Sequence, residues 1–383
     1  MKKRLITLHL VLFASFFSFL CHAQTREELQ KAQQFFDEGN AAFKRGEIPS
    51  AIENLTKAIE FYPQSSQLFN ARGMMFAEQS KFPEAIKDFD KAIEIYPNFA
   101  EAFDNRGSAY KSSGNPNQAI KDHTKAIEIN PRMVSAYNNR GNAYRAIRDF
   151  NAAIKDFDKA IELNAVSADA YSNRGSAFQE SGNSAKAIED LNKAISLNPN
   201  AARFYANRGN IYTLMKQYDS ALADLNKSLE LTPNPLAFYG RAQLNQTRQN
   251  LDEAINDYTK ALEINPNFAE AYNNRGLIYQ TKGNLDAALQ DFTKAVSLNE
   301  KNGIYYFNRA TIYVLKKDFS SAVRDFTKTI EIFPLWAEAF RRRSDTYKKL
   351  GQKKPAEADL KKAKEVESRN FNPANETAVI ISQ

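Results

Sequence analysis

Few residues in this sequence could act as nucleophiles or general bases. The chain has three histidines and one cysteine, and only His123 lies beyond the first 22 residues. His123 stands at a position that other parts of the chain fill with phenylalanine, which predicts a packed core imidazole. Neither a Ser–His–Asp nor a Cys–His arrangement has support, and no phosphate-binding glycine loop, dinucleotide fingerprint or HExxH motif occurs. We therefore expect no enzymatic activity, no cofactor and no metal.

Arginine and aspartate recur with a fixed spacing, since each of nine arginines is followed by an aspartate sixteen residues later. The pairs are Arg72 and Asp88, Arg106 and Asp122, Arg140 and Asp156, Arg174 and Asp190, Arg208 and Asp224, Arg241 and Asp257, Arg275 and Asp291, Arg309 and Asp325, and Arg343 and Asp359. An open arginine row would bind anions, whereas a buried charge needs a partner. We favour structural ion pairs, with Arg140 reaching Asp156 and Asp122 as the rival partner.

Asparagine precedes the arginine in six of these segments. The six residues are Asn105, Asn139, Asn173, Asn207, Asn274 and Asn308. A carboxamide offers two donors and an acceptor, which match the alternating groups of a peptide main chain. The column therefore predicts a ladder of asparagines that binds a peptide. The alternative is that asparagine is only a small polar residue on a solvated helix face, and that it recurs because one ancestral repeat was duplicated.

These columns exist because the chain repeats itself about every 34 residues, with one step of 33 between Arg208 and Arg241. Each unit has apolar residues at helical spacing in two segments, which predicts two helices. Where the helices cross, one column is always alanine and the other is glycine, alanine or serine. Such small side chains let two helix backbones approach closely. Glycine in the turn and proline after the second helix predict where the helices end.

The period, glycine, alanine, tyrosine and proline positions together resemble the tetratricopeptide repeat family. The resemblance implies an all-α, right-handed superhelical solenoid of stacked helix-turn-helix hairpins, whose first helices line a concave groove. The resemblance covers 32–366, and the expected domain is 24–366 with ten repeats. Their expected bounds are 32–65, 66–99, 100–133, 134–167, 168–201, 202–234, 235–268, 269–302, 303–336 and 337–366. Some relatives hold an extended peptide on an asparagine ladder, which implies other proteins or peptides as partners.

The N-terminal segment has the layout of a signal peptide. Lys2, Lys3 and Arg4 precede an apolar run, 5–20, and Ala23 is the expected last residue removed. The run has 16 residues, whereas a membrane span takes roughly 20. We expect cleavage of 1–23 and export to the periplasm or the medium. The alternative is a lipoprotein anchored through Cys21. Cleavage lowers the formal charge from +7 to +4, because no acid leaves with the three basic residues.

The C-terminal repeat is the most basic part of the chain, with eleven basic and six acidic residues in 337–369. A terminal repeat needs a polar outer face, which is the interpretation we favour. An acidic partner or an anionic membrane surface is the alternative. Nucleic acid is not expected, because base-stacking aromatic residues are not interleaved with the charges. Trp336 is expected to pack between hairpins, and 367–383 forms a C-terminal tail.

The leading functional hypothesis is therefore a non-enzymatic module that binds a peptide or extended segment along the asparagine column. The alternative is a scaffold that joins folded cell-envelope proteins through its convex face or its basic C-terminal end.

Overall fold

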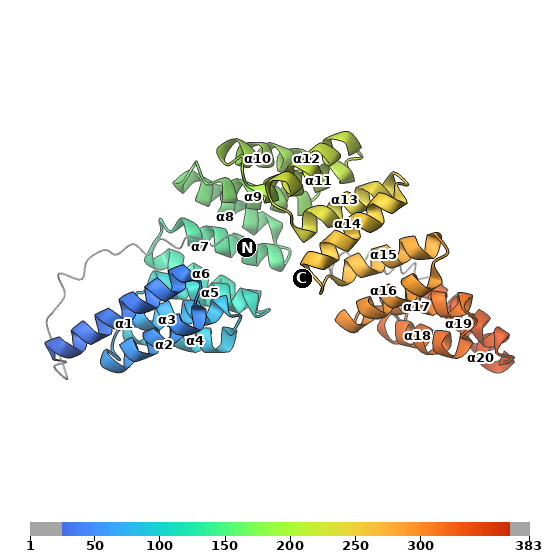
Figure 1. Ribbon diagram of the computed structural model, residues 1–383, viewed down its shortest axis with the longest axis horizontal. Coiled ribbons are helices and arrows are strands. Elements are labelled where there is room, and N and C mark those ends of the chain that lie inside the picture. The colour runs from blue at the N-terminus through green and yellow to red at the C-terminus, as the bar shows by residue number, and fades with distance from the viewer. Residues whose placement is uncertain (1–24, 368–383) are drawn as a thin grey trace. The chain divides into compact units, whose positions relative to one another are not determined.

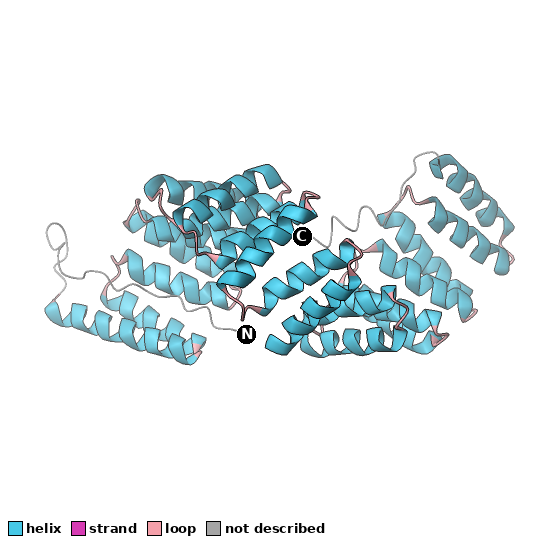
Figure 2. Cartoon of the chain, turned by 90° about the horizontal axis from the view of Figure 1, so that it is seen from above, coloured by secondary structure: helices cyan, strands magenta, loops and turns pink. Residues whose placement is uncertain are grey.

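The structure is a computed structural model that describes residues 25–367. The expected signal peptide, 1–23, and the tail from 368 onward lie outside these residues. The described chain consists of twenty helices joined by short turns, and it contains no strand (Figure 2). In this part of the protein, every helix is too short or too polar to span a bilayer. The all-α fold class is confirmed.

Consecutive helices pair into ten antiparallel hairpins, numbered here in chain order (Figure 1). The first helices are α1 (Arg26–Arg45), α3 (Ser66–Glu78), α5 (Ala100–Ser112), α7 (Val134–Ala146), α9 (Ala168–Glu180), α11 (Ala202–Leu214), α13 (Pro235–Thr247), α15 (Ala269–Thr281), α17 (Gly303–Leu315) and α19 (Ala337–Lys349). The second helices are α2 (Ile48–Phe61), α4 (Phe82–Ile95), α6 (Pro116–Ile129), α8 (Phe150–Leu163), α10 (Ser184–Leu197), α12 (Tyr218–Leu231), α14 (Leu251–Ile264), α16 (Leu285–Leu298), α18 (Phe319–Ile332) and α20 (Lys353–Glu367).

The hairpins belong to two compact units. Hairpins one to three lie in the unit that ends at Met133, and hairpins four to ten lie in the unit that begins at Val134. Helix α1 begins six residues before the expected repeat boundary. The reason is a capping box, in which the Thr25 side chain accepts from the Glu28 N–H and the Glu28 carboxylate accepts from the Thr25 N–H.

Small residues at the helix crossing are required by the distance between the two helices. The alanine column is fully buried, from Ala51 to Ala356. A Cβ added to Gly141 would lie 2.7 Å from a ring carbon of Phe157, which is closer than two carbon atoms can approach without movement. A larger side chain here would overpack the crossing at a cost of about 1–3 kcal/mol.

The turn inside each hairpin places one residue in the left-handed conformation. Five of these residues are the expected glycines, Gly46, Gly114, Gly182, Gly283 and Gly351, with φ between 75° and 90°. The other five turns use residues with a side chain, namely Ser80, Arg148, Lys216, Gln249 and Lys317, with φ between 58° and 65°. These five turns carry the steric cost of a Cβ that glycine avoids.

Lys317→Gly should therefore stabilise the protein. Lys317 has φ 62°, and glycine adopts this conformation without the clash, so the free energy of unfolding should rise by about 1 kcal/mol. Lys316→Gly is the control: Lys316 has φ −81° at the end of α17 and pairs with Asp286, so its replacement gains nothing from glycine and should lower the free energy of unfolding. Thermal unfolding followed by circular dichroism measures both. An equal response of the two variants would contradict the explanation.

The last hairpin ends its stack with polar residues. Two positions of the second helix are apolar in hairpins one to nine, for example Ile154 and Ile161 in α8. In α20 these positions are Glu357 and Lys364, and both are exposed. Leu360 is 37% exposed, although its counterparts in the other hairpins are buried. The basic end therefore has the polar outer face of a terminal repeat.

Trp336 lies at the joint between hairpins nine and ten. Its ring is 4.3 Å from the ring of Phe307, centroid to centroid, and also contacts Phe333 edge to face. The tryptophan therefore packs against hairpin nine, directly before α19 begins.

Candidate functional site

Each arginine of the repeated column contacts the aspartate of its own hairpin with two parallel hydrogen bonds. Nε and Nη2 donate to the two carboxylate oxygens over 2.7–2.9 Å. The aspartates are buried, and the arginine side chains are 15–22% exposed. The pairs are Arg72–Asp88, Arg106–Asp122, Arg140–Asp156, Arg174–Asp190, Arg208–Asp224, Arg241–Asp257, Arg275–Asp291, Arg309–Asp325 and Arg343–Asp359. Arg140 thus pairs with Asp156, within its hairpin.

In seven of the nine arginines, the third guanidinium nitrogen donates a hydrogen bond to the preceding hairpin. Nη1 donates to a threonine, aspartate or asparagine on the preceding second helix over 2.5–3.1 Å. Arg174, for example, donates to Asp158 as well as to Asp190. Each arginine therefore joins the two helices of its hairpin and, in these seven cases, also joins two hairpins. The spacing of residues in the sequence did not predict this second contact.

Aromatic rings of the same helix cover the guanidinium groups. The residue three positions earlier is aromatic in all nine hairpins that carry the arginine, and its ring lies 5.3–5.8 Å from the guanidinium carbon. In five hairpins a second ring, four positions later, lies on the guanidinium as well. Hydrogen bonding to Asp190 raises the pKa of Arg174, although burial opposes it. These arginines are charged but already paired, which leaves no open row for an anion.

The asparagine column lies half-buried on the first helices, next to the arginines. Three of its six members donate to the preceding hairpin: Asn105 to Asn70 over 2.9 Å, Asn274 to the Tyr239 hydroxyl over 2.9 Å and Asn308 to Asn273 over 2.8 Å. These acceptors stand 35 residues before their donors. That spacing could have been read from the sequence. Part of the ladder therefore joins hairpins to each other.

Asn173 of α9 and Asn207 of α11 differ from those three residues. Within residues 25–367, the side chains of both are half-buried and form no hydrogen bond. Next to them in the column, Asn139 is half-buried on α7 and has interactions of its own. Two successive first helices therefore each carry an asparagine whose side-chain amide has no hydrogen-bond partner in the described protein. We call these two amides the uncommitted carboxamides.

The column is interrupted at Gly240 for a steric reason. A Cβ at Gly240 would lie 2.3 Å from the side-chain oxygen of Asn210 on α11. Hairpin six is one residue shorter than the others, and Asn210 occupies the space where hairpin seven would otherwise present a side chain.

His123 is fully buried, and its Nδ1 lies 2.7 Å from a carboxylate oxygen of Asp104 on α5. Its Nε2 is buried without a hydrogen-bond partner. Sequence reasoning identified the packed imidazole but missed Asp104. In the described part of the chain, no three histidine, cysteine, aspartate or glutamate side chains lie together as metal ligands would.

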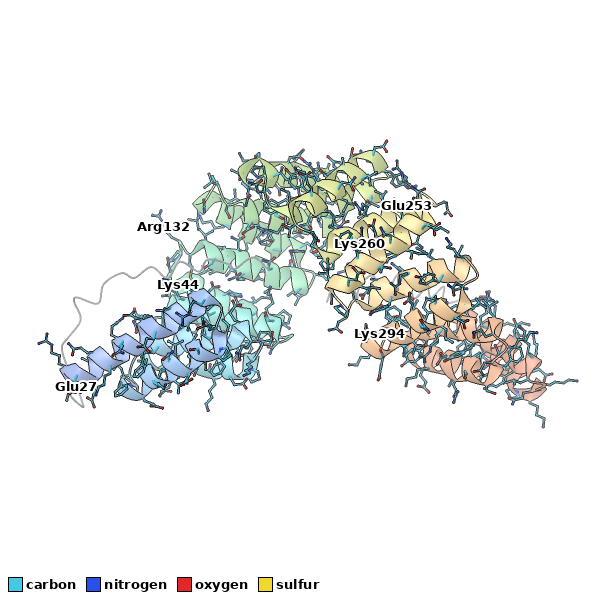
Figure 3. The ribbon with its side chains drawn as sticks, in the orientation of Figure 1. Glu27, Lys44, Arg132, Glu253, Lys260 and Lys294 are labelled. Atoms are coloured by element: carbon cyan, nitrogen blue, oxygen red, sulfur yellow. The ribbon has the colours of Figure 1, made fainter. Side chains whose placement is uncertain are left out.

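Charged side chains also cover the second helices, as Glu253 of α14 and Lys294 of α16 show (Figure 3). A lysine recurs at one position in all ten second helices, from Lys57 to Lys362. The recurring carboxamides, by contrast, lie on the first helices.

Comparison with protein families identifies the repeats. Models described as tetratricopeptide repeat match residues 36–98, 89–121, 134–165, 168–201, 202–235, 269–302 and 337–370, and a model described as TPR repeat matches 107–147 and 247–283. The chain belongs to the tetratricopeptide repeat family. This fold generally mediates protein–protein interactions, and its members are generally non-enzymatic.

Solved structures agree on the fold. A tetratricopeptide repeat protein from Parabacteroides merdae ATCC 43184 is 23% identical, with a TM-score of 0.57 over 65% of this chain and 99% of that one. The Cut9–Hcn1 hetero-tetramer of the APC/C is 19% identical, with a TM-score of 0.57 over 78% of this chain and 59% of that one. At these identities the similarity shows the fold alone. A search of curated proteins gave no match.

Proposed function

We propose that this protein is an exported, non-enzymatic module that holds a peptide or an extended protein segment on the surface of its first helices. The observation that carries the proposal is the pair of uncommitted carboxamides, Asn173 and Asn207, on successive first helices. Each can donate to a main-chain carbonyl and accept from a main-chain N–H. An extended segment needs such partners, because its own backbone groups are otherwise unpaired.

Export remains part of the proposal and rests on the sequence of 1–23. A partner would then be another exported protein or a segment of one. Neither a cofactor nor a metal has a role in this proposal, and the paired arginines offer no site for nucleic acid.

Asn173→Ala combined with Asn207→Ala tests the ladder. The double variant should bind retained peptides about tenfold more weakly, because two hydrogen bonds are lost at about 0.5–1.5 kcal/mol each. Its unfolding midpoint should stay close to that of the wild type, since neither side chain has a partner in the free chain. The assay is an array of short, unstructured peptides of random sequence, followed by titration of the peptides that are retained.

Asn274→Ala combined with Asn308→Ala is the matched control. These residues donate to Tyr239 and Asn273, so their loss should lower the unfolding midpoint and leave peptide affinity nearly unchanged. If Asn173 and Asn207 are dispensable for binding, the scaffold function through the convex face or the basic last hairpin is favoured instead.

A further inference from the structure

The first helices of hairpins six to nine carry aliphatic side chains on the face that holds the asparagine column. Residues three and four positions apart share one face of a helix, as Ile304, Asn308, Thr311 and Leu315 do in α17. At these positions of α11, α13, α15 and α17 the aliphatic residues are Leu214, Leu236, Leu277, Ile304 and Leu315. We call these five residues the aliphatic surface.

The aliphatic surface differs from ordinary exposed apolar residues, which occur singly on most proteins and need no explanation. Its members come from four consecutive first helices, whereas α5, α7 and α9 carry no large apolar residue at the same positions. Leu214, Leu236 and Leu315 are each more than half exposed. Apolar side chains that gather on one face mark a site that binds other apolar groups.

A pocket of about 250 Å³ lies where hairpins nine and ten meet. Leu335, Trp336 and Val366 give it an apolar lining. Glu338 also lines it and stands at the same repeat position as Ile304, so the pocket borders the face that carries the aliphatic surface. A cavity of about 150 Å³ can hold a benzene ring, so this pocket has room for an aromatic side chain.

The chain leaves its last helix beside this pocket, because Glu367 is both the final residue of α20 and part of the lining. The sequence that follows contains an aromatic residue, Phe371, and an uncharged run, Ala-Val-Ile-Ile, at 378–381. An extended chain spans about 3.5 Å per residue, so the twelve steps from Glu367 to Val379 reach about 40 Å. Packed helices lie about 10 Å apart, so the run can reach the first helices of hairpins nine, eight and seven.

We propose that this segment binds to the first helices of its own molecule. Phe371 fills the pocket between hairpins nine and ten. Val379 and Ile381 point the same way in an extended chain, and both lie on the aliphatic surface. Their contacts are Leu277 of α15 and Ile304 of α17. The run brings no charge with it, so no ion is desolvated when it binds.

The consequence is a competitor that belongs to the chain itself. A partner segment that uses the aliphatic surface has to displace residues 378–381 first. This consequence rests on the proposed function, whereas the binding of the segment does not.

The full-length chain with Val379→Ser, Ile380→Ser and Ile381→Ser, called the tail variant, tests the contact. A labelled synthetic peptide of residues 368–383 should bind the tail variant with saturation. It should bind the wild type about tenfold more weakly, because the wild type's own segment competes at an effective concentration in the millimolar range. Fluorescence anisotropy measures both affinities. Equal affinity for the two proteins, or no saturable binding to the tail variant, would overturn the inference.

Leu277→Ser combined with Ile304→Ser, added to the tail variant, tests the placement. The peptide should bind about tenfold more weakly, because two apolar contacts are lost. The fold should be kept, since Ser176 and Ser135 occupy these repeat positions in other hairpins. Ile264→Ser is the control, because Ile264 is 47% exposed but lies on the second helix α14. Equal weakening by the control would overturn the placement on the first helices.

Sedimentation of the wild type distinguishes binding within one molecule from exchange between copies. The wild type should stay monomeric as its concentration rises. A dimer that the tail variant does not form would show that the segment binds a second copy, which overturns binding within one molecule. The random-sequence array takes no part in these measurements, so the proposed function and this inference can fail separately.

Discussion

Arg140→Leu should lower the free energy of unfolding by about 3–5 kcal/mol, because it leaves a buried carboxylate without its charge partner. In the native structure Nε and Nη2 of Arg140 donate to the two oxygens of Asp156 over 2.8 and 2.7 Å. Asp156 is 6% exposed, so water cannot replace the lost bonds. Chemical denaturation followed by circular dichroism measures the loss.

Adding Asp156→Leu to Arg140→Leu should recover part of that stability, since an apolar pair can replace a buried ion pair at little net cost. Adding Asp190→Leu instead should cause a second loss, because Asp190 is the partner of Arg174 in the next hairpin. If Asp190→Leu rescues Arg140→Leu and Asp156→Leu does not, the charge pairing within the hairpin does not determine stability.

The sequence predicted these pairs because the same contact recurs in nine hairpins, each time between residues sixteen positions apart. Two residues sixteen positions apart within one hairpin keep the same geometry in every repeat. The contact of the third guanidinium nitrogen was missed for a physical reason. It depends on how one hairpin stacks on the next, and its acceptor varies, as Thr56, Asp90 and Asn192 show.

The candidate binding surface was less predictable than the fold. The column of asparagines is visible in the sequence, but Asn274 donates to its own protein and Asn207 does not. This difference is set by whether the preceding hairpin offers an acceptor. Tyr239 offers a hydroxyl to Asn274, whereas Ser172 and Asn207 form no hydrogen bond with each other. The residue type at one position of the repeat therefore does not show whether that side chain contacts a ligand or the neighbouring hairpin.

His123→Phe alone should destabilise the first unit by about 1.5–3 kcal/mol, because the buried Asp104 carboxylate would lose its hydrogen bond to the imidazole. The native His123 Nδ1 lies 2.7 Å from Asp104, and both residues are buried. The phenylalanine itself should fit, since Phe89 and Phe157 occupy the equivalent position in neighbouring hairpins and are fully buried. Any loss would therefore come from charge and not from packing.

Adding Asp104→Asn to His123→Phe should remove that loss and leave the protein more stable than the wild type. The same combination of asparagine and phenylalanine, nineteen residues apart, occurs naturally as Asn70 with Phe89, Asn138 with Phe157 and Asn273 with Phe292. The double variant also removes the buried Nε2, which has no hydrogen-bond partner in the native structure; an unsatisfied buried group costs about 1–3 kcal/mol. The unfolding midpoints of the wild type, both single variants and the double variant give the coupling energy. A double variant as unstable as His123→Phe would show that the lost hydrogen bond to Asp104 is not the cause of the instability.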